Sequence, residues 1–242
     1  MANVTFNGYV PEPVADDAIS VTLGVFFDGT KNNKNNTSAR KGKKEGEAYD
    51  AYKEYGGSID ENISYNNDWS NVARLWDNYQ KTNAIYIEGI GTVNLGDDEM
   101  DGYAYGSKDT GIKKKVESGC VEISKKVKNL VLNSGNKKMS LITLDVFGFS
   151  RGAAAARHFV HEVSKRIKSD KFGKLGEKLR TDGIDTEELS INIRFLGLFD
   201  TVSSYSENVW TTSPNFDNDI EELHLDDIAK AKNCSFYCSR RA

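Results

Sequence analysis

The stretch Met139–Ala156, which reads MSLITLDVFGFSRGAAAA, decides the fold that we predict for this chain. Its first nine residues form an apolar run with branched side chains, which indicates a buried strand. The residues from Gly152 to Ile167 have the composition and spacing of a helix. Between the two lies Gly148-Phe-Ser-Arg-Gly152, a Gly-x-Ser-x-Gly motif in the strand-to-helix position that a nucleophile elbow occupies.

Ser150 is the candidate nucleophile of this motif. In an elbow the serine sits on a strained turn, and Gly148 and Gly152 are needed because a Cβ atom there would collide with neighbouring main chain. The turn would direct the hydroxyl toward a helix N-terminus, where the N–H of Arg151 could donate to a developing oxyanion. The alternative is a Gly-Ser turn that only begins a helix.

The alternation of strands and helices continues on both sides of this stretch. Apolar, β-branched runs predict strands at 19–27, 84–88 and 191–199. Apolar spacings of three and four predict helices at 69–79 and 109–133. Strands that alternate with helices indicate an α/β fold, with a mainly parallel sheet and helices on both of its faces.

Two residues follow Ser150 in the serine, acid, histidine order of such hydrolases. Asp200 ends the strand 191–199, so we expect it at the same sheet edge as the serine, although it could instead cap a following helix. His224 is the only histidine after Asp200 and could be the base, or it could be a solvated histidine in an acidic segment.

The strand 19–27 also reaches this edge, where it ends at Asp28 and Gly29. Their turn could supply a second oxyanion N–H, or it could be only a turn-forming Asp-Gly pair. Residues 31–68 then form a polar segment longer than an ordinary connection, which predicts a functional loop or a disordered insertion. We expect an N-terminal extension at 1–17 and a single catalytic domain at 18–242.

Composition argues against several classes of protein. The 242 residues carry 32 basic and 36 acidic side chains, a net charge of −4, which does not favour non-specific binding of nucleic acid. No apolar run approaches the ~20 residues of a membrane-spanning helix, and 1–17 lacks the features of a signal peptide. Three cysteines and three histidines form neither a disulfide framework nor a zinc-ligand pattern. We therefore expect a cytoplasmic site of synthesis, no metal and no cofactor.

Five segments carry a resemblance to a known family: Leu23–Asn33, Asn67–Leu75, Tyr86–Thr92, Gly148–Arg157 and Phe195–Val202. Together they resemble the catalytic domain of the type VI secretion phospholipase effectors, the first lipase family of that system, which has an α/β-hydrolase fold. Phe-Phe-Asp-Gly-Thr followed by Gly-Phe-Ser-Arg-Gly-Ala is more specific than the elbow alone.

This resemblance implies that Ser150 is the nucleophile, that Asp200 is the acid, and that the Asp28-Gly29 turn belongs to the oxyanion region. The implied reaction is hydrolysis of an acyl ester of a glycerophospholipid, which would damage the membrane of a rival bacterium. The implied partners are a secretion spike protein and a neutralising immunity protein, with delivery by type VI secretion to a target cell.

The C-terminal residues depart from the family pattern. Members of the family continue after a segment like His224–Lys232 into a His-x-x-Ala-x-Asp-Glu-x-Arg block, whereas this chain reads NCSFYCSRRA over 233–242. One choice of codons for these residues, read one base forward, encodes Ile-Val-His-Phe-Ile-Ala-Ala-Asp-Glu. We therefore hypothesise that 233–242 is a frameshifted tail, that the domain is incomplete at its C-terminus, and that the base was encoded where Cys234 and Ser235 stand.

Three functions follow as alternatives. The first is a serine esterase that acts on phospholipid. The second is a truncated, catalytically impaired remnant or binding module of that family, and the third is an esterase that acts on another ester, because the elbow defines the chemistry and not the substrate. Whether a histidine reaches Ser150 distinguishes the first from the second.

Overall fold

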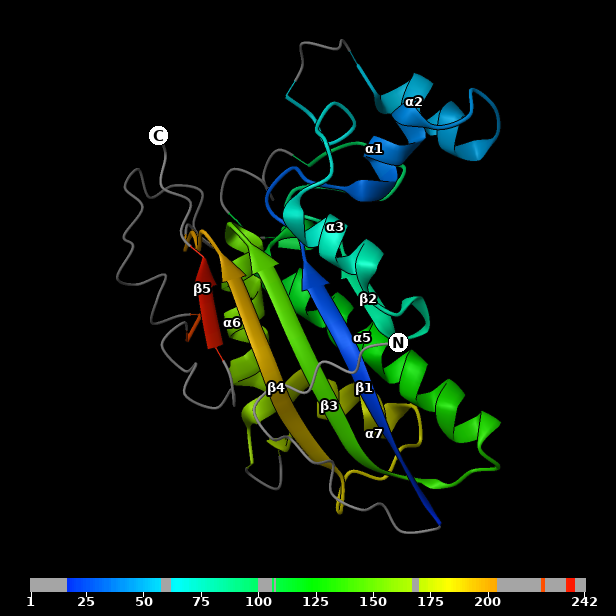
Figure 1. The fold of residues 1–242 in the computed structure, drawn as a ribbon, viewed down its shortest axis with the longest axis vertical. Helices are drawn as coiled ribbons and strands as arrows, with labels where there is room; N and C mark the ends of the chain where they lie inside the picture. The colour runs from blue at the N-terminus through cyan, green and yellow to red at the C-terminus, as the bar shows by residue number, and fades with distance from the viewer. Residues whose placement is uncertain are drawn as a thin grey trace.

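The computed structural model describes residues 17–57, 62–99, 106, 108–166, 170–203, 223–224 and 234–237. Within these ranges, the strands are β1 (Ala18–Phe27), β2 (Ala84–Ile87), β3 (Lys138–Phe149), β4 (Ser190–Phe199) and β5 (Cys234–Tyr237) (Figure 1). The helices are α1 (Lys34–Lys41), α2 (Glu47–Tyr55), α3 (Asn71–Asn78), α5 (Ile112–Asn133), α6 (Arg151–Ser164) and α7 (Gly173–Thr181), with short 3-10 turns at Lys81–Asn83 and Lys108–Thr110.

The described strands form one parallel sheet in the order β2-β1-β3-β4-β5, which confirms the predicted α/β class. β1 pairs with β3 up to Phe27 and Gly148, and β3 pairs with β4 up to Phe149 and Phe199. Since the strands run in one direction, their C-terminal ends meet at one edge, toward the top of Figure 1. The residues that follow these ends therefore share that edge.

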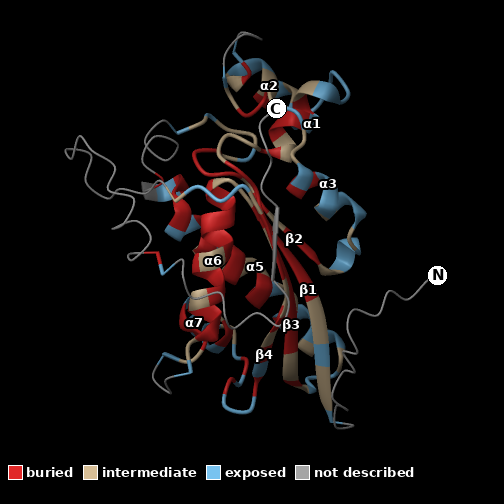
Figure 2. Ribbon diagram, turned by 60° about the vertical axis from the view of Figure 1, so that its left-hand side comes forward, coloured by how far each residue is buried: buried red, intermediate tan, exposed pale blue. Residues whose placement is uncertain are grey.

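Helices cover both faces of the sheet, as the sequence predicts. On one face, α5, α6 and α7 bury the main apolar core, to which β3 contributes Ile142, Leu144 and Val146. On the other face, α3 packs a smaller cluster around Phe26 and Val72. In Figure 2 the sheet lies between these two layers, and the buried residues are concentrated in and behind α6.

Small side chains bring α6 close to the sheet. Ala153, Ala154, Ala155 and Ala156 are all fully buried, and α6 contacts β1, β3 and β4. Larger side chains at these positions would hold the helix further from the strands, because a close-packed interior has no spare volume. The four alanines thus fix where α6 begins relative to the ends of three strands.

The polar segment 31–68 is packed onto the domain over its described parts, 31–57 and 62–68. The segment contains α1 and α2. Buried hydrogen bonds connect α1 to the rest of the segment and to the domain. The Asn36 side-chain amide donates to Ser64 Oγ at 2.8 Å and to Val93 O at 2.9 Å. The described parts of this segment thus form helices and side-chain contacts with the domain. The helix that was expected to reach Ile167 ends at Ser164.

Two predicted segments lie largely outside the described residues. Of the N-terminal extension 1–17 only residue 17 is described, and of the tail 233–242 only β5 is described. β5 pairs in parallel with the end of β4, a strand that the sequence does not predict. The frameshift stays a prediction. Within the described ranges, no helix combines the length and apolar character needed to cross a membrane.

Candidate active site

Ser150 occupies the sharp turn between β3 and α6. Its φ of 55° and ψ of −127° belong to a backbone conformation that residues other than glycine rarely adopt. Such a conformation costs about 1–3 kcal/mol and persists only where the surrounding structure enforces it. A strained serine between a strand and a helix is the geometry of a nucleophile elbow.

Main chain passes directly over Gly148 and Gly152. A Cβ atom on Gly148 would lie 2.5 Å from Gly152 O. A Cβ atom on Gly152 would lie 2.2 Å from Asp28 O and 2.5 Å from Phe27 O. Carbon and oxygen atoms do not approach so closely, so the packing gives the physical reason for glycine at both positions.

The end of β4 holds Ser150 from one side. Ser150 N–H donates to Phe199 O at 2.9 Å, and Val202 N–H donates to Ser150 O at 3.2 Å. Asp200 lies between these two residues, is exposed, and has a positive φ of 51°. The fold therefore brings the backbone of Asp200 to the elbow.

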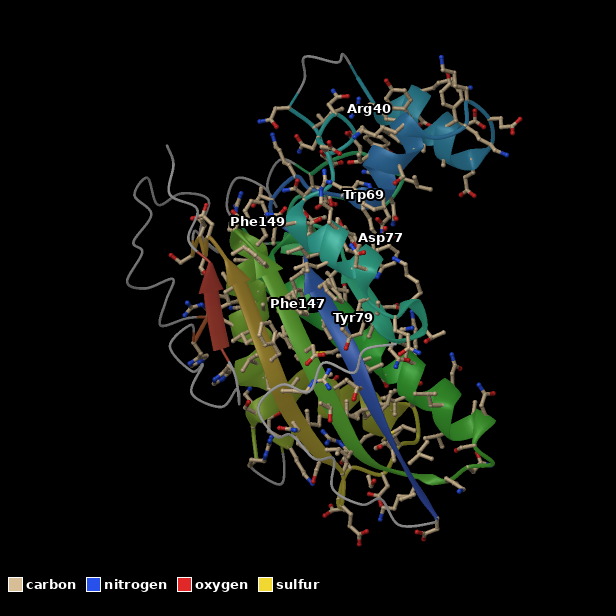
Figure 3. The ribbon with its side chains drawn as sticks, viewed as in Figure 1. Arg40, Trp69, Asp77, Tyr79, Phe147 and Phe149 are labelled. Carbon is tan, nitrogen blue, oxygen red and sulfur yellow. The ribbon has the colours of Figure 1, made fainter. Side chains whose placement is uncertain are left out.

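The turn after β1 holds the elbow from the other side. Gly152 packs on Asp28 O, and the ring of Phe149, which Figure 3 labels at the end of β3, closes on Gly29, where a Cβ atom would lie 2.4 Å from Phe149 Cδ1. Arg151 begins α6, a helix of 14 residues whose N-terminal end carries a partial positive charge. An anion that formed beside Ser150 would be stabilised by that end of the helix.

The Asp28 carboxylate is buried under this turn and is only 1% exposed. It accepts hydrogen bonds from Gly29 N–H at 2.8 Å and from the Tyr86 hydroxyl at 2.6 Å, and it also pairs with the Ser70 side chain. Burial raises the pKa of the Asp28 carboxyl, and the three hydrogen bonds oppose that rise. Asp28 thereby joins β2 and the start of α3 to the turn. The sequence predicts the Asp28-Gly29 turn as a possible source of an oxyanion N–H, but in the structure the Gly29 N–H donates to this carboxylate.

The fold does not bring His224 to Ser150. His224 stacks on His161 with ring centroids 4.1 Å apart, and His161 lies 6.3 Å from His158 in the same stack. His161 is eleven residues along α6 from Ser150, which is about 16 Å at the usual helical rise. Leu223 fixes this position because its side chain is fully buried in the core and its carbonyl oxygen lies 3.0 Å from His158 Nδ1.

These three histidines are all that the sequence contains. The site therefore unites the candidate nucleophile, the backbone of the candidate acid and the turn after β1, and it places the candidate base elsewhere. Among the residues that the structure describes, no group of three or more His, Cys, Asp or Glu side chains could hold a metal ion.

Tyr86 and Ser70 lie in two of the segments that carry the family resemblance, but no local pattern places them at this turn. Tyr86 pairs in register with Phe26, which stands two residues before Asp28. Side chains two residues apart in an extended segment share a face, so Tyr86 and Asp28 lie on the same face of the sheet. Fifty-eight residues separate Tyr86 from Asp28 along the chain. The pairing of β1 with β2 could have identified Tyr86, but no local pattern could.

The parallel sheet and the strained serine turn define an α/β protein of the hydrolase-like class, with elbow geometry at Ser150. No family model matches the sequence, and no curated protein matches it.

The solved structures that are similar to the chain include the following two. One is described as the Tle1 effector bound to the VgrG spike from the Type 6 secretion system; it is 29% identical, with a TM-score of 0.47, over 82% of this chain and 42% of that chain. The other is a crystal structure of an uncharacterized protein from Pseudomonas aeruginosa; it is 24% identical, with a TM-score of 0.32, over 77% of this chain and 30% of that chain. The chain thus spans less than half the length of either protein.

Proposed function

We propose that the chain carries the nucleophile of a serine hydrolase that acts on acyl esters, with Ser150 in that role. The observation that supports the proposal best is the strained backbone of Ser150, enforced by main chain packed against two glycines. A serine that merely began a helix would have an extended backbone and would cap the helix through its hydroxyl. Ser150 has neither feature, since its φ is positive and its side chain makes no capping hydrogen bond.

In the proposed reaction, Ser150 Oγ attacks the ester carbonyl carbon while a base takes the hydroxyl proton, and the carbonyl oxygen becomes an oxyanion beside the N-terminus of α6. Collapse of the oxyanion breaks the ester bond and releases the alcohol, which takes up that proton, and water then hydrolyses the acyl-serine. The N–H of Arg151 donates to this oxyanion, and the carboxylate of Asp200 is placed to stabilise a base that has taken up the proton. The three histidines stack along α6, away from this edge. The rate at which Ser150 attacks an ester then depends on the elbow and the oxyanion region alone. A base supplied from solution should increase this rate, because it can take the hydroxyl proton.

We further propose a glycerophospholipid as the substrate and an antibacterial effector of type VI secretion as the biological role. The support is the set of five sequence segments that resemble the phospholipase effectors of that system. A spike protein as carrier, an immunity protein and delivery to a target cell are proposals of the same origin. Hydrolysis of a phospholipid vesicle, compared with hydrolysis of a soluble short-chain ester, tests the substrate.

Labelling with a fluorophosphonate probe tests the nucleophile. We expect covalent labelling of the folded protein at Ser150, slow in plain buffer and faster with added imidazole, which can act as the missing base. Ser150→Ala should abolish labelling under both conditions. Folded wild-type protein that stays unlabelled in imidazole would contradict the proposal.

The position of the histidines favours a second candidate function. A domain that keeps the elbow but holds every histidine away from it could be a non-catalytic binding module of the same family. Under this alternative, Ser150 is inert to the probe with or without imidazole. The labelling experiment therefore distinguishes the two candidates directly.

A further inference from the structure

The backbone N–H groups of residues 28–32 are engaged with one exception. Four of them donate within the protein: Asp28 N–H to Ile87 O at 3.0 Å, Gly29 N–H to Asp28 Oδ1 at 2.8 Å, Lys31 N–H to Ile90 O at 3.1 Å, and Asn32 N–H to Gly29 O at 2.9 Å. The fifth, Thr30 N–H, has no acceptor among the residues that the structure describes. Thr30 N–H is thus the one donor of this turn that the described residues leave for a bound group.

The geometry of the turn explains why Thr30 is the exception. The bond from Asn32 N–H to Gly29 O closes a four-residue turn. Lys31, in its third position, has a positive φ of 58°, whereas Thr30, in its second position, does not. This combination defines a type II turn, in which the N–H of the second residue takes no part in the closing hydrogen bond.

Two contacts bring Thr30 to the nucleophile. Its hydroxyl accepts a hydrogen bond from Arg151 Nε at 2.8 Å, so its side chain touches the residue that follows Ser150. Its neighbour Asp28 lies under Gly152, where a Cβ atom would be only 2.2 Å from Asp28 O. The start of α6 and the turn are thus in contact at Thr30 and at Asp28. The half-buried position of Thr30 matches that of Ser150.

We propose that Thr30 N–H is the second oxyanion donor, beside Arg151 N–H, and that Gly29 N–H is not. The assignment rests on the proposed function, since an oxyanion forms only if Ser150 attacks a carbonyl. The Asp28 carboxylate is then a positioning group, because it binds Gly29 N–H and holds the turn that presents Thr30.

Two substitutions at one position test the assignment. Thr30→Pro removes the backbone N–H and the hydroxyl, whereas Thr30→Val removes only the hydroxyl. Proline is common in the second position of a type II turn, so we expect the Thr30→Pro protein to fold. In imidazole, fluorophosphonate labelling of Thr30→Pro should be about 10²–10³ slower than that of Thr30→Val, which is the loss expected when one oxyanion donor is removed.

The outcomes separate this assignment from the proposed function. Thr30→Pro protein that folds and labels as fast as Thr30→Val would overturn the assignment and leave Ser150 as the nucleophile. Wild-type protein that does not label at all would overturn both. If Thr30→Pro fails to fold, replacement of the Thr30 amide by a backbone ester removes the same N–H and keeps the side chain. Labelling of this ester as fast as that of wild type would overturn the assignment.

Discussion

Replacement of Gly152 by alanine is the most direct test of how the elbow is held. In an ordinary helix this change is stabilising by about 0.8–1.0 kcal/mol, because alanine has the higher helix propensity. In α6 the new Cβ atom would lie 2.2 Å from Asp28 O, so this backbone oxygen must move by about 0.8 Å to reach even 3.0 Å. Overpacking of this kind costs about 1–3 kcal/mol, and here the obstacle is main chain, which cannot rotate away.

Because the obstacle is main chain, we expect the upper end of this cost, and after subtraction of the helix-propensity gain Gly152→Ala should lower the free energy of unfolding by about 2 kcal/mol, measured by urea denaturation. The thermal midpoint should fall by about 4–8 °C for a domain of this size. The matched control is Gly119→Ala in α5, where the nearest neighbours of the new Cβ atom would be side chains, Phe27 at 3.1 Å and Ile87 at 3.8 Å. That ring can shift by a few tenths of an ångström, so the control should stay within about 1 kcal/mol of wild type.

The same substitution should slow the reaction. The oxygen that must move belongs to the turn that we propose as the oxyanion region, and a displacement of about 1 Å at a reacting centre can cost about 10²-fold in rate. We expect fluorophosphonate labelling of Ser150 in Gly152→Ala to be at least about tenfold slower than in Gly119→Ala. Stability and labelling equal to those of the control would refute the reasoning that Gly152 is required by the approach of β1.

Three further predictions concern the histidine stack and the buried carboxylate. His224→Ala should leave labelling of Ser150 unchanged, because His224 stacks on His161, which lies about 16 Å along α6 from that serine; a tenfold loss would show that His224 reaches the site. Burial lowers the pKa of the His158 ring from 6.5 to about 4. The stability that the neutral ring contributes is therefore complete above pH 6.5, and up to about 3 kcal/mol of unfolding free energy is lost as the pH falls toward 4. Urea denaturation of His158→Gln should accordingly depend less on pH than that of wild type between pH 7 and 4, and parallel curves would contradict this. Tyr86→Phe should cost about 1–3 kcal/mol of unfolding free energy, because it removes a hydrogen bond from the buried Asp28 carboxylate; a change below about 0.5 kcal/mol would show that water replaces the hydroxyl.

Local patterns in the sequence predict the parts of the site that lie close together along the chain. The apolar run of β3, the Gly-x-Ser-x-Gly motif and the alanines of α6 are contiguous, and each has a spacing that favours one conformation. The alternation of strands and helices likewise predicts the parallel sheet, because parallel neighbours require a crossover between them. Asp28 and Asp200 reach the elbow for the same reason, since both follow strands that end at one edge.

Long-range contacts decide the rest. Asp28 lies at the predicted edge, but the pairing of β1 with β2 brings Tyr86 to its carboxylate, and that carboxylate takes the Gly29 N–H. His224 follows Asp200 in the order of a catalytic triad, but the burial of Leu223 holds it against α6.

The sequence by itself determined the elbow, the direction of the strands and the edge at which the site lies, because hydrophobic period and glycine geometry act over a few residues. Only the tertiary structure decided which N–H groups of the turn after β1 are engaged and where the histidines lie. Those outcomes depend on which distant groups satisfy a buried carboxylate and which apolar side chain fills the core, and both are set by packing between segments far apart in the chain.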